Sequence, residues 1–496
     1  VLVTTRISEF REVPLLSIEG LPEDEALELF TRYYPKLKPE EAKTVEQIRL
    51  AVYANTLVLE LLAKSLKQLN SLKTRYSLDN LLNDLQANGL LSIPTREVEI
   101  DYKDYAKTDP KEIIKAMYDV VGLDDIERKW LAIFAVLPAE NIPYSTLDLL
   151  LDMSEEEDKT LLSLCEQGWL ERIEEGEDIF IKCSPVIQEV VKHKHGRLRE
   201  DCDGLVQALI DKLEYETGIN HPKHVSYALA GELVGYGETV VATFDAPDHN
   251  LGVLYERMGA YYTGTGNLAG ALTTFERYAE ISKILCAVEP DNRDSKNSLA
   301  IACSKLGNIY QAQGDQEKAL EYYQEYHRLS EVLHQAHPEQ MQFKNNLAIA
   351  CQNLGIIYKA QGKLEQALKY YQEYHRLEEE LHQDHPKQVQ FKNLLAISCQ
   401  CLGIIYRDQG NQEQALEYFQ EYHRLKKELY QANPEQVAFK NGLAIASQYL
   451  GSIYKAQGKQ EQALEYYQEL HRLEEELHQT YPEQVAFKNG LAVALG

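Results

Sequence analysis

The sequence predicts a mainly α-helical protein whose second half is a right-handed α-solenoid of helical hairpins, preceded by a helical domain and a winged helix. The main observation is a repeat: Leu-Ala-Ile-Ala begins at Leu299, and close copies begin at Leu347, Leu395, Leu443 and Leu491, a period of 48 residues. A fixed period of this length is typical of stacked supersecondary units, none of which buries its apolar face alone. Such arrays usually bind other molecules and rarely catalyse reactions.

Each repeat has the spacing of a helical hairpin. In the first clear copy, Gly314 can adopt the left-handed backbone that ends a first helix, and Asp315 suits the N-cap of a second helix. Pro338 marks the next helix start, because proline is tolerated in the first turn of a helix but not inside it. Gly307 and Ala319 are small where the two helices should cross. The spacing predicts helices of ~20 residues, or ~30 Å each.

These residues resemble the tetratricopeptide repeat (TPR). Its pattern of leucine-glycine, tyrosine, alanine and an aromatic residue falls on Leu306-Gly307, Tyr310, Ala319 and Tyr323, and it recurs in the later copies. The common repeat has about 34 residues, so each unit here carries roughly 14 more. The resemblance covers about half of the chain, and it implies a protein-binding solenoid whose first helices line the concave face.

The TPR resemblance also implies which side chains meet the partner, a protein ligand on the concave face. They are polar residues of the first helices: Asn308, Gln311, Gln352, Lys359, Gln400, Arg407, Gln448 and Lys455. One register carries Gln311, Lys359, Arg407 and Lys455, a modest basic track in an acidic chain. We therefore expect an acidic stretch on the partner. The alternative is that these are ordinary solvated side chains.

The first half of the chain has no repeat and consists of separate helical pieces. Residues 1–6 form a short β-branched strand, and helices are predicted over 22–34, 39–53 and 55–69. A lone strand cannot satisfy its own backbone hydrogen bonds, so 1–6 should belong to a sheet whose remainder is absent. The chain begins without methionine and stops early in a new repeat. We therefore expect it to be a piece of a longer protein.

This order resembles the C-terminal part of the nucleotide-binding module of STAND NTPases, the NB-ARC and NACHT-like switch ATPases. In that family a strand ending in Thr-Thr-Arg supplies an arginine that senses the γ-phosphate, and Arg6 matches it. Residues 21–30 look like the segment that opens the family's small helical domain. Residues 54–59 align with the Gly-x-Pro-Leu-Ala-Leu turn that contacts adenine, with Thr56 in place of the proline. The resemblance implies ATP or ADP with Mg²⁺ in the parent protein and none bound by this piece alone.

A winged-helix order follows. The elements are helices over 125–136, near 144–152 and over 156–168, a hairpin over 169–181 and a helix over 186–191. DNA binding is disfavoured, because the candidate recognition helix at 156–166 is acidic and would repel phosphate. The same domain occurs in STAND proteins, where a histidine contacts the β-phosphate of ADP. The resemblance places Ser184 at that position.

Composition excludes several classes of protein. The net charge of −27 and a pI near 5.0 argue against a nucleic-acid or anionic-membrane binder. No apolar run approaches the ~18 residues of a membrane span, and we expect a cytoplasmic protein. The 8 cysteines lack metal or disulfide spacing. The cluster His327, His334 and His337 recurs as His375, His382 and His385, but the next copy keeps only His423, with Tyr430 and Asn433 at the other two positions, so no metal site is predicted. No phosphate-binding loop and no catalytic constellation is found, so no residue is assigned a catalytic role.

The predicted organisation has five parts: the end of an NTPase core at 1–20, a helical domain at 21–90, a linker and winged helix at 91–195, a helical linker at 196–250, and TPR-like repeats at 251–496. The two resemblances imply the sensor and regulatory part of a STAND signal-transduction NTPase. A protein trigger, such as a phage protein, would bind the array and release an ADP-locked switch that then self-associates, in antiphage defence. The alternatives are a STAND-type transcriptional regulator and a TPR scaffold whose nucleotide site has decayed.

Overall fold

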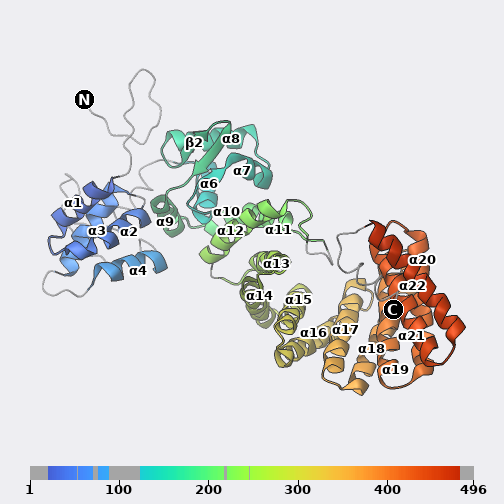
Figure 1. Ribbon diagram of the computed structural model, residues 1–496. Coiled ribbons are helices and arrows are strands. Elements are labelled where there is room, and N and C mark those ends of the chain that lie inside the picture. Colours follow the sequence, from blue (N-terminus) through green and yellow to red (C-terminus); the bar gives the residue numbers. More distant parts are fainter. Residues whose placement is uncertain are drawn as a thin grey trace. The chain divides into compact units, whose positions relative to one another are not determined.

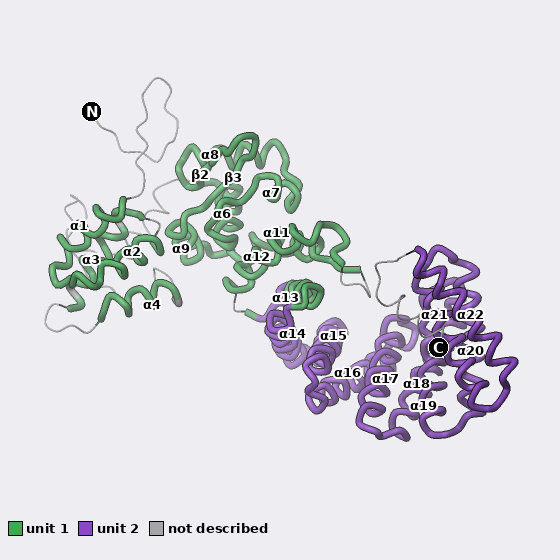
Figure 2. The backbone as a smooth tube through the Cα atoms, in the orientation of Figure 1, with its two compact units in different colours: residues 1–246, 253–266 green, residues 247–252, 267–496 purple. Residues whose placement is uncertain are grey.

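The computed structural model describes residues 21–52, 54–70, 76–88, 123–216, 221–244 and 246–480. The chain divides into two compact units, residues 1–246 with 253–266 and residues 247–252 with 267–496 (Figure 2). The described part is mainly helical, which confirms the predicted fold class (Figure 1). The predicted strand at 1–6 lies outside the described residues.

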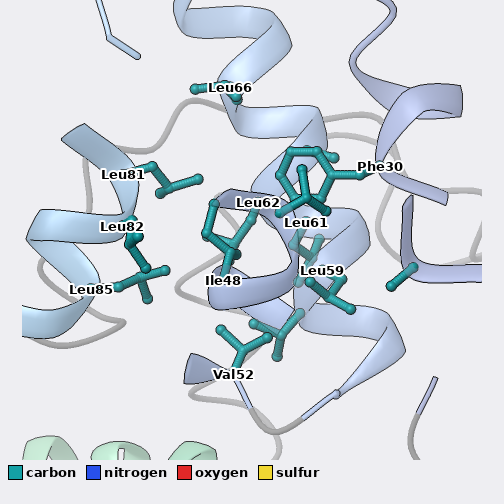
Figure 3. Close-up of a cluster of buried hydrophobic side chains, with 14 of the residues drawn as sticks. Phe30, Ile48, Val52, Leu59, Leu61, Leu62, Leu66, Leu81, Leu82 and Leu85 are labelled. Atoms are coloured by element: carbon teal, nitrogen blue, oxygen red, sulfur yellow. The ribbon is translucent and has the colours of Figure 1, made fainter. Parts of the chain in front are cut away.

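The first unit begins with a bundle of helices. Its elements are α1 (Glu23–Tyr33), η1 (Pro39–Glu41), α2 (Ala42–Ala51), α3 (Thr56–Leu69) and α4 (Leu78–Asn88). Their apolar side chains meet in one core, where Phe30 and Ile48 lie close to the leucines of α3 (Figure 3). Along α3, buried Leu59, Leu62 and Leu66 recur at helical spacing, so one face of this helix is apolar. The three helices predicted here are present.

Four helices and a small sheet follow in the first unit. The elements are α6 (Asp125–Val136), β1 (Ile142–Pro143), α7 (Tyr144–Leu151), α8 (Glu155–Glu166), β2 (Glu171–Glu175), β3 (Asp178–Lys182) and α9 (Pro185–Lys194). The antiparallel sheet has the order β1-β3-β2, and Ile181 pairs with both Ile142 and Arg172. The predicted hairpin is thus present as β2 and β3, with Gly176 at φ 68° in its turn.

Helix α9 contributes to the cores on both sides of it. Val186 and Val190 belong to the apolar core of the helical bundle. On α9, Gln188 Nε2 donates to the carbonyl oxygens of Phe134 and Leu137 at 2.8 and 2.9 Å. Carbonyls at a helix end have no partner within the helix, so these bonds complete the C-terminus of α6. One helix therefore ties the bundle to the sheet-containing part.

The first unit ends with four further helices. They are α10 (Leu198–Asp201), α11 (Asp203–Lys212), α12 (Tyr227–Thr243) and α13 (His249–Gly264), of which residues 253–264 group with this unit. Helices α12 and α13 approach closely, because a Cβ atom at Gly237 would lie 2.8 Å from Sδ of Met258.

The second unit is an array of long helices that form hairpins. They are α14 (Leu268–Val288), α15 (Arg293–Ala312), α16 (Gln316–Ala336), α17 (Met341–Ala360), α18 (Leu364–Asp384), α19 (Val389–Asp408), α20 (Gln412–Ala432), α21 (Val437–Ala456) and α22 (Gln460–Thr480). Each first helix, α15, α17, α19 and α21, has 20 residues, and each second helix has 21. The predicted helix length is confirmed.

The turns inside the hairpins are those expected from the sequence. Gly314 has φ 82°, and the equivalent Gly362, Gly410 and Gly458 have φ between 73° and 82°. These angles lie in the left-handed region that favours glycine. The Asp315 side chain then accepts a hydrogen bond from the Lys318 amide at 3.1 Å and caps the second helix.

The two helices of a hairpin cross where the sequence places its small residues. A Cβ atom at Gly307 would lie 2.5 Å from Cε1 of Tyr323, and Ala319 is fully buried. Successive hairpins are joined by a repeated hydrogen bond to a tyrosine hydroxyl: Gln324 donates to Tyr358 at 3.1 Å, Gln372 to Tyr406 at 3.1 Å, and Gln420 to Tyr454 at 2.9 Å. The same contacts thus recur with the sequence period.

Within the described ranges, α19 is the one helix long and apolar enough to cross a membrane, and 50% of its apolar window is buried. Its neighbours are the flanking helices α18 and α20. Because α15, α17 and α21 occupy equivalent places in their own hairpins, the apolar character of α19 is that of a repeated core helix.

Candidate protein-binding face and nucleotide-linked residues

The eight predicted partner-binding residues all lie on first helices of the array. Four are exposed, namely Asn308, Gln311, Arg407 and Lys455, and four are half-buried, namely Gln352, Lys359, Gln400 and Gln448. Asn308 and Gln311 are three residues apart, and the two residues on each later first helix are seven apart, so each pair lies on one face of its helix. All eight side chains keep some contact with solvent. Their role in binding a partner stays a prediction that their accessibility allows.

At the first hairpin, a tyrosine fixes two of these amides. The Tyr323 hydroxyl lies 2.7 Å from Oδ1 of Asn308 and 2.8 Å from Oε1 of Gln311. A hydroxyl has one proton to donate, so the two amide oxygens share it. The NH₂ group of each amide is then turned away from the tyrosine and is the donor that these residues offer to a ligand.

The predicted basic track also contains a carboxylate, that of Asp408, which was not predicted. Asp408 lies 3.4 Å from the Lys359 ammonium and 3.0 Å from the Arg407 guanidinium. Arg407 also lies over the ring of Tyr449, and Lys455 over the ring of Tyr467. The two central cations therefore share one counter-ion, and the track is less positive than its lysines and arginine suggest. The signal was available, because the other repeats have alanine where this one has Asp408.

An aliphatic column lies among the polar residues and was also missed. Ile356 is 37% exposed and sits one turn from both Gln352 and Lys359. Ile404, its equivalent in the next repeat, is half-buried, as is Ile349. Counting three and four residues from the predicted positions would have found these isoleucines. The face thus combines amides, paired charges and aliphatic surface.

The segment that was aligned with the adenine-contacting motif, residues 54–59, begins with a residue in a left-handed backbone conformation. Ala54 has φ 52°, a left-handed conformation that favours glycine, and glycine is the motif residue at this position. The Leu21 amide donates to the Ala54 carbonyl at 3.0 Å, which fixes the turn. Asn55 caps α3 by accepting from the Val58 amide at 3.1 Å. Thr56 is the first residue of α3 and is exposed.

Ser184 is the N-cap of α9. Its hydroxyl oxygen accepts a hydrogen bond from the Ile187 amide at 3.4 Å. The hydroxyl proton is still available as a donor, because capping uses only the oxygen lone pairs. Arg6 lies outside the described residues. The predicted set of Arg6, Thr56 and Ser184 therefore stays a prediction.

Among the described residues, no group of three or more His, Cys, Asp or Glu side chains could hold a metal ion. Cys303, Cys351 and Cys399 of the first helices are buried, and burial raises the pKa of Cys303 and of Cys399 to about 12. A thiol with such a pKa is neither a ready nucleophile nor a ready metal ligand. These cysteines act as small apolar side chains.

Comparison with known families identifies the repeats. Tetratricopeptide-repeat profiles match residues 302–331, 350–382, 395–434 and 446–473. The array contains tetratricopeptide repeats. No curated protein matches the sequence.

Solved structures resemble parts of the chain in fold. BtubC (BKLC) from P. vanneervenii is 19% identical, with 51% of this chain and 91% of that one covered and a TM-score of 0.39. TTC0263, a TPR protein of Thermus thermophilus, is 18% identical, with coverages of 49% and 97% and a TM-score of 0.27. PH0952 from Pyrococcus horikoshii, a STAND protein with a tetratricopeptide repeat sensor, is 15% identical, with coverages of 96% and 72% and a TM-score of 0.23.

Proposed function

We propose that this chain is the sensor and regulatory part of a STAND signal-transduction NTPase. The TPR array binds a protein trigger on the first-helix face, and binding releases a switch held closed by ADP in the cytoplasm. The released form self-associates, and the pathway serves antiphage defence, with a phage protein as the trigger. The chain's acidic charge disfavours nucleic acid as the ligand.

The array is the observation that carries the proposal. Repeated hairpins hold accessible side chains at one register of successive first helices, from Gln352 through Gln400 to Gln448. An extended surface built by repetition suits a polypeptide ligand better than a small molecule. The trigger shifts the switch only through a difference in its affinity for the closed and open forms.

The first unit supports the switch. Its residues resemble motifs of the STAND module in their order along the chain, and Ala54, which aligns with the motif glycine, has a left-handed backbone that glycine favours. Ser184 begins α9, the helix that joins the bundle to the sheet-containing part through Val186, Val190 and Gln188. We assign that part to the winged helix of the module. A ligand that touched Ser184 would thus act on the helix shared by both cores.

A TPR scaffold with a decayed nucleotide site is the second candidate. The observation that favours it is the departure at two motif positions, Thr56 for proline and Ser184 for histidine. Serine has a shorter side chain than histidine and cannot become cationic, so it binds a phosphate group less strongly.

Site-specific photo-crosslinking tests the array's role. A benzoylphenylalanine placed at Gln352 should form a protein adduct in phage-infected cells, because this position lies on the proposed binding face. The matched control is Gln383, an exposed glutamine on the second helix α18. Equal adducts at both positions, or adducts only at Gln383, would contradict a first-helix binding face.

Asp408 tests the expected acidity of the trigger. Asp408→Ala restores the residue of the other repeats and frees Lys359 and Arg407, so an acidic trigger should bind severalfold more tightly at low salt. Replacing Lys359, Arg407 and Lys455 with glutamate should weaken capture. Titration by fluorescence anisotropy measures both effects. Unchanged affinities in both variants would retire the idea of an acidic trigger.

A further inference from the structure

A cavity of about 360 Å³ opens at the junction between α14 and α15. We call it the Ser295 pocket, after the buried residue at its floor. Its apolar lining comes from Leu285 and Val288, and its polar lining includes His249, Glu289 and Asp294. Val288 is 72% exposed, an unusual state for a large aliphatic side chain beside a cavity.

At the later junctions between successive hairpins, α16–α17, α18–α19 and α20–α21, the position of Ser295 is occupied by phenylalanine. The residues 48, 96 and 144 positions after Ser295 are Phe343, Phe391 and Phe439. They are only 3%, 3% and 7% exposed, and the rings of Phe343 and Phe391 pack against those of His337 and His385 at 5.8 and 5.7 Å. The first junction thus has a serine where the array otherwise has an aromatic side chain.

The burial of a neighbouring leucine shows what the missing ring covers. Leu333, Leu381 and Leu429 are 2%, 1% and 2% exposed at the junctions that contain phenylalanine. At the first junction the equivalent Leu285 is only half-buried. Filling the pocket with an aromatic side chain would remove this apolar surface from water, which is favourable in proportion to the area covered.

The charges at the pocket specify what should accompany the aromatic side chain. Two carboxylates, those of Glu289 and Asp294, line the pocket, whereas no lysine or arginine is among its lining residues. Asp294 is paired with Arg293 at 3.1 Å. A basic residue next to the incoming ring would complement this rim.

We propose that the Ser295 pocket receives an aromatic side chain, flanked by a basic residue, from a partner polypeptide. The ring takes the place that Phe343 holds at the next junction, between Leu285 and Val288. A buried aromatic anchor within a polar rim is the usual energetic centre of a protein interface. The site lies at a helix junction, apart from the first-helix column, and so goes beyond the proposed trigger-binding face.

Methyl NMR of the full chain tests the pocket with acetyl-phenylalanyl-lysine amide as the probe. The methyl signals of Leu285 and Val288 should shift saturably with probe concentration. Acetyl-alanyl-lysine amide should bind at least tenfold more weakly because it lacks the ring. Acetyl-phenylalanyl-glutamate amide should also bind more weakly because of the acidic rim. Absent shifts, or equal binding of these peptides, would overturn the proposal.

Two variants separate binding from folding. Ser295→Phe should keep the helical circular dichroism and raise the melting temperature, yet abolish the probe shifts, because its own ring fills the pocket. Phe343→Ser should create a second pocket, reported by new probe shifts at Leu333. Undiminished probe binding to Ser295→Phe would contradict the proposal. Sedimentation experiments test whether a second copy of the chain occupies the pocket instead. If the wild-type protein self-associates and Ser295→Phe does not, the occupant is a second copy, and the proposal is also overturned.

Discussion

At the scale of single residues, one register of the second helices holds polar side chains away from water. Ser330, Glu378, Lys426 and Glu474 follow one another at the repeat spacing and are 0%, 0%, 5% and 6% exposed. Both carboxylate oxygens of Glu378 lack a hydrogen-bond partner. Burying a carboxyl group without a hydrogen-bond partner is costly, so Glu378 weakens the array.

Glu378→Met should stabilise the array, most strongly at alkaline pH. Burial raises the pKa of the Glu378 carboxyl from 4.5 to about 8, so the folded protein holds a proton that the unfolded chain releases above pH 4.5. Stability is therefore lost as the pH rises from 4.5 to 8, and the variant should gain about 3 kcal/mol at pH 7. Urea unfolding between pH 5 and 9 measures this gain. Glu379→Gln, at an exposed neighbour, serves as the control. A gain that does not depend on pH would contradict the assignment.

Lys426→Met should show the opposite pH dependence. Burial lowers the pKa of the Lys426 ammonium from 10.5 to about 8, although Nζ donates to Oδ1 of Asn393 at 2.6 Å. Below pH 8, burial of the charged ammonium lowers the folding stability of the wild-type protein by about 3 kcal/mol. This loss of stability disappears as the pH rises from 8 to 10.5. The variant's advantage in urea unfolding should shrink over that range. If the stability advantage of Lys426→Met over the wild type grew with pH, the lowered pKa of Lys426 would be contradicted.

The burial of Glu378 and Lys426 could not be predicted from the sequence. A charged residue in a helical repeat is usually exposed to solvent. Whether it is buried instead depends on the space that residues of neighbouring helices leave around it. Gly442 provides part of that space, since a Cβ atom there would lie 2.9 Å from Cδ of Lys426. Such compensation between distant positions cannot be predicted from one residue's type or helical phase.

At the scale of elements, the hairpins were predictable because their determinants are local. Gly314 ends a helix through its backbone angle, Asp315 caps the next helix through its own side chain, and Gly307 permits the crossing. The charge of the binding face was not predictable in the same way. Asp408 lies beside Lys359 of the preceding repeat, and this contact exists only once the hairpins stack.

Gly307→Ala should destabilise the array by about 1–3 kcal/mol, because the added methyl group would overlap the Tyr323 ring. That ring cannot move without losing the hydrogen bonds of its hydroxyl to Asn308 and Gln311. The control is Gly235→Ala within α12, where no atom lies within 4 Å of the added Cβ. That change should stabilise the first unit by up to about 1 kcal/mol, because alanine loses less backbone entropy in a helix. Thermal unfolding compares the two. Equal effects would show that the close crossing is not required.

At the scale of the whole molecule, repetition decided how much the sequence could predict. The second unit was predictable from its period, and its informative positions are departures from that period, such as Ser295 and Asp408. The first unit has no internal repeat for comparison, so the prediction that some of its residues contact a nucleotide depends on a motif resemblance. Helix α9 shows what that resemblance could not supply, namely that one helix completes two cores.

The bound nucleotide of the full-length gene product tests the central claim most directly. The purified protein is denatured, and the released nucleotide is identified and quantified by chromatography. A closed STAND switch predicts about one ADP per chain, displaced when the trigger binds. A protein that releases no nucleotide and does not bind added ATP would contradict the switch and leave the TPR scaffold as the better account.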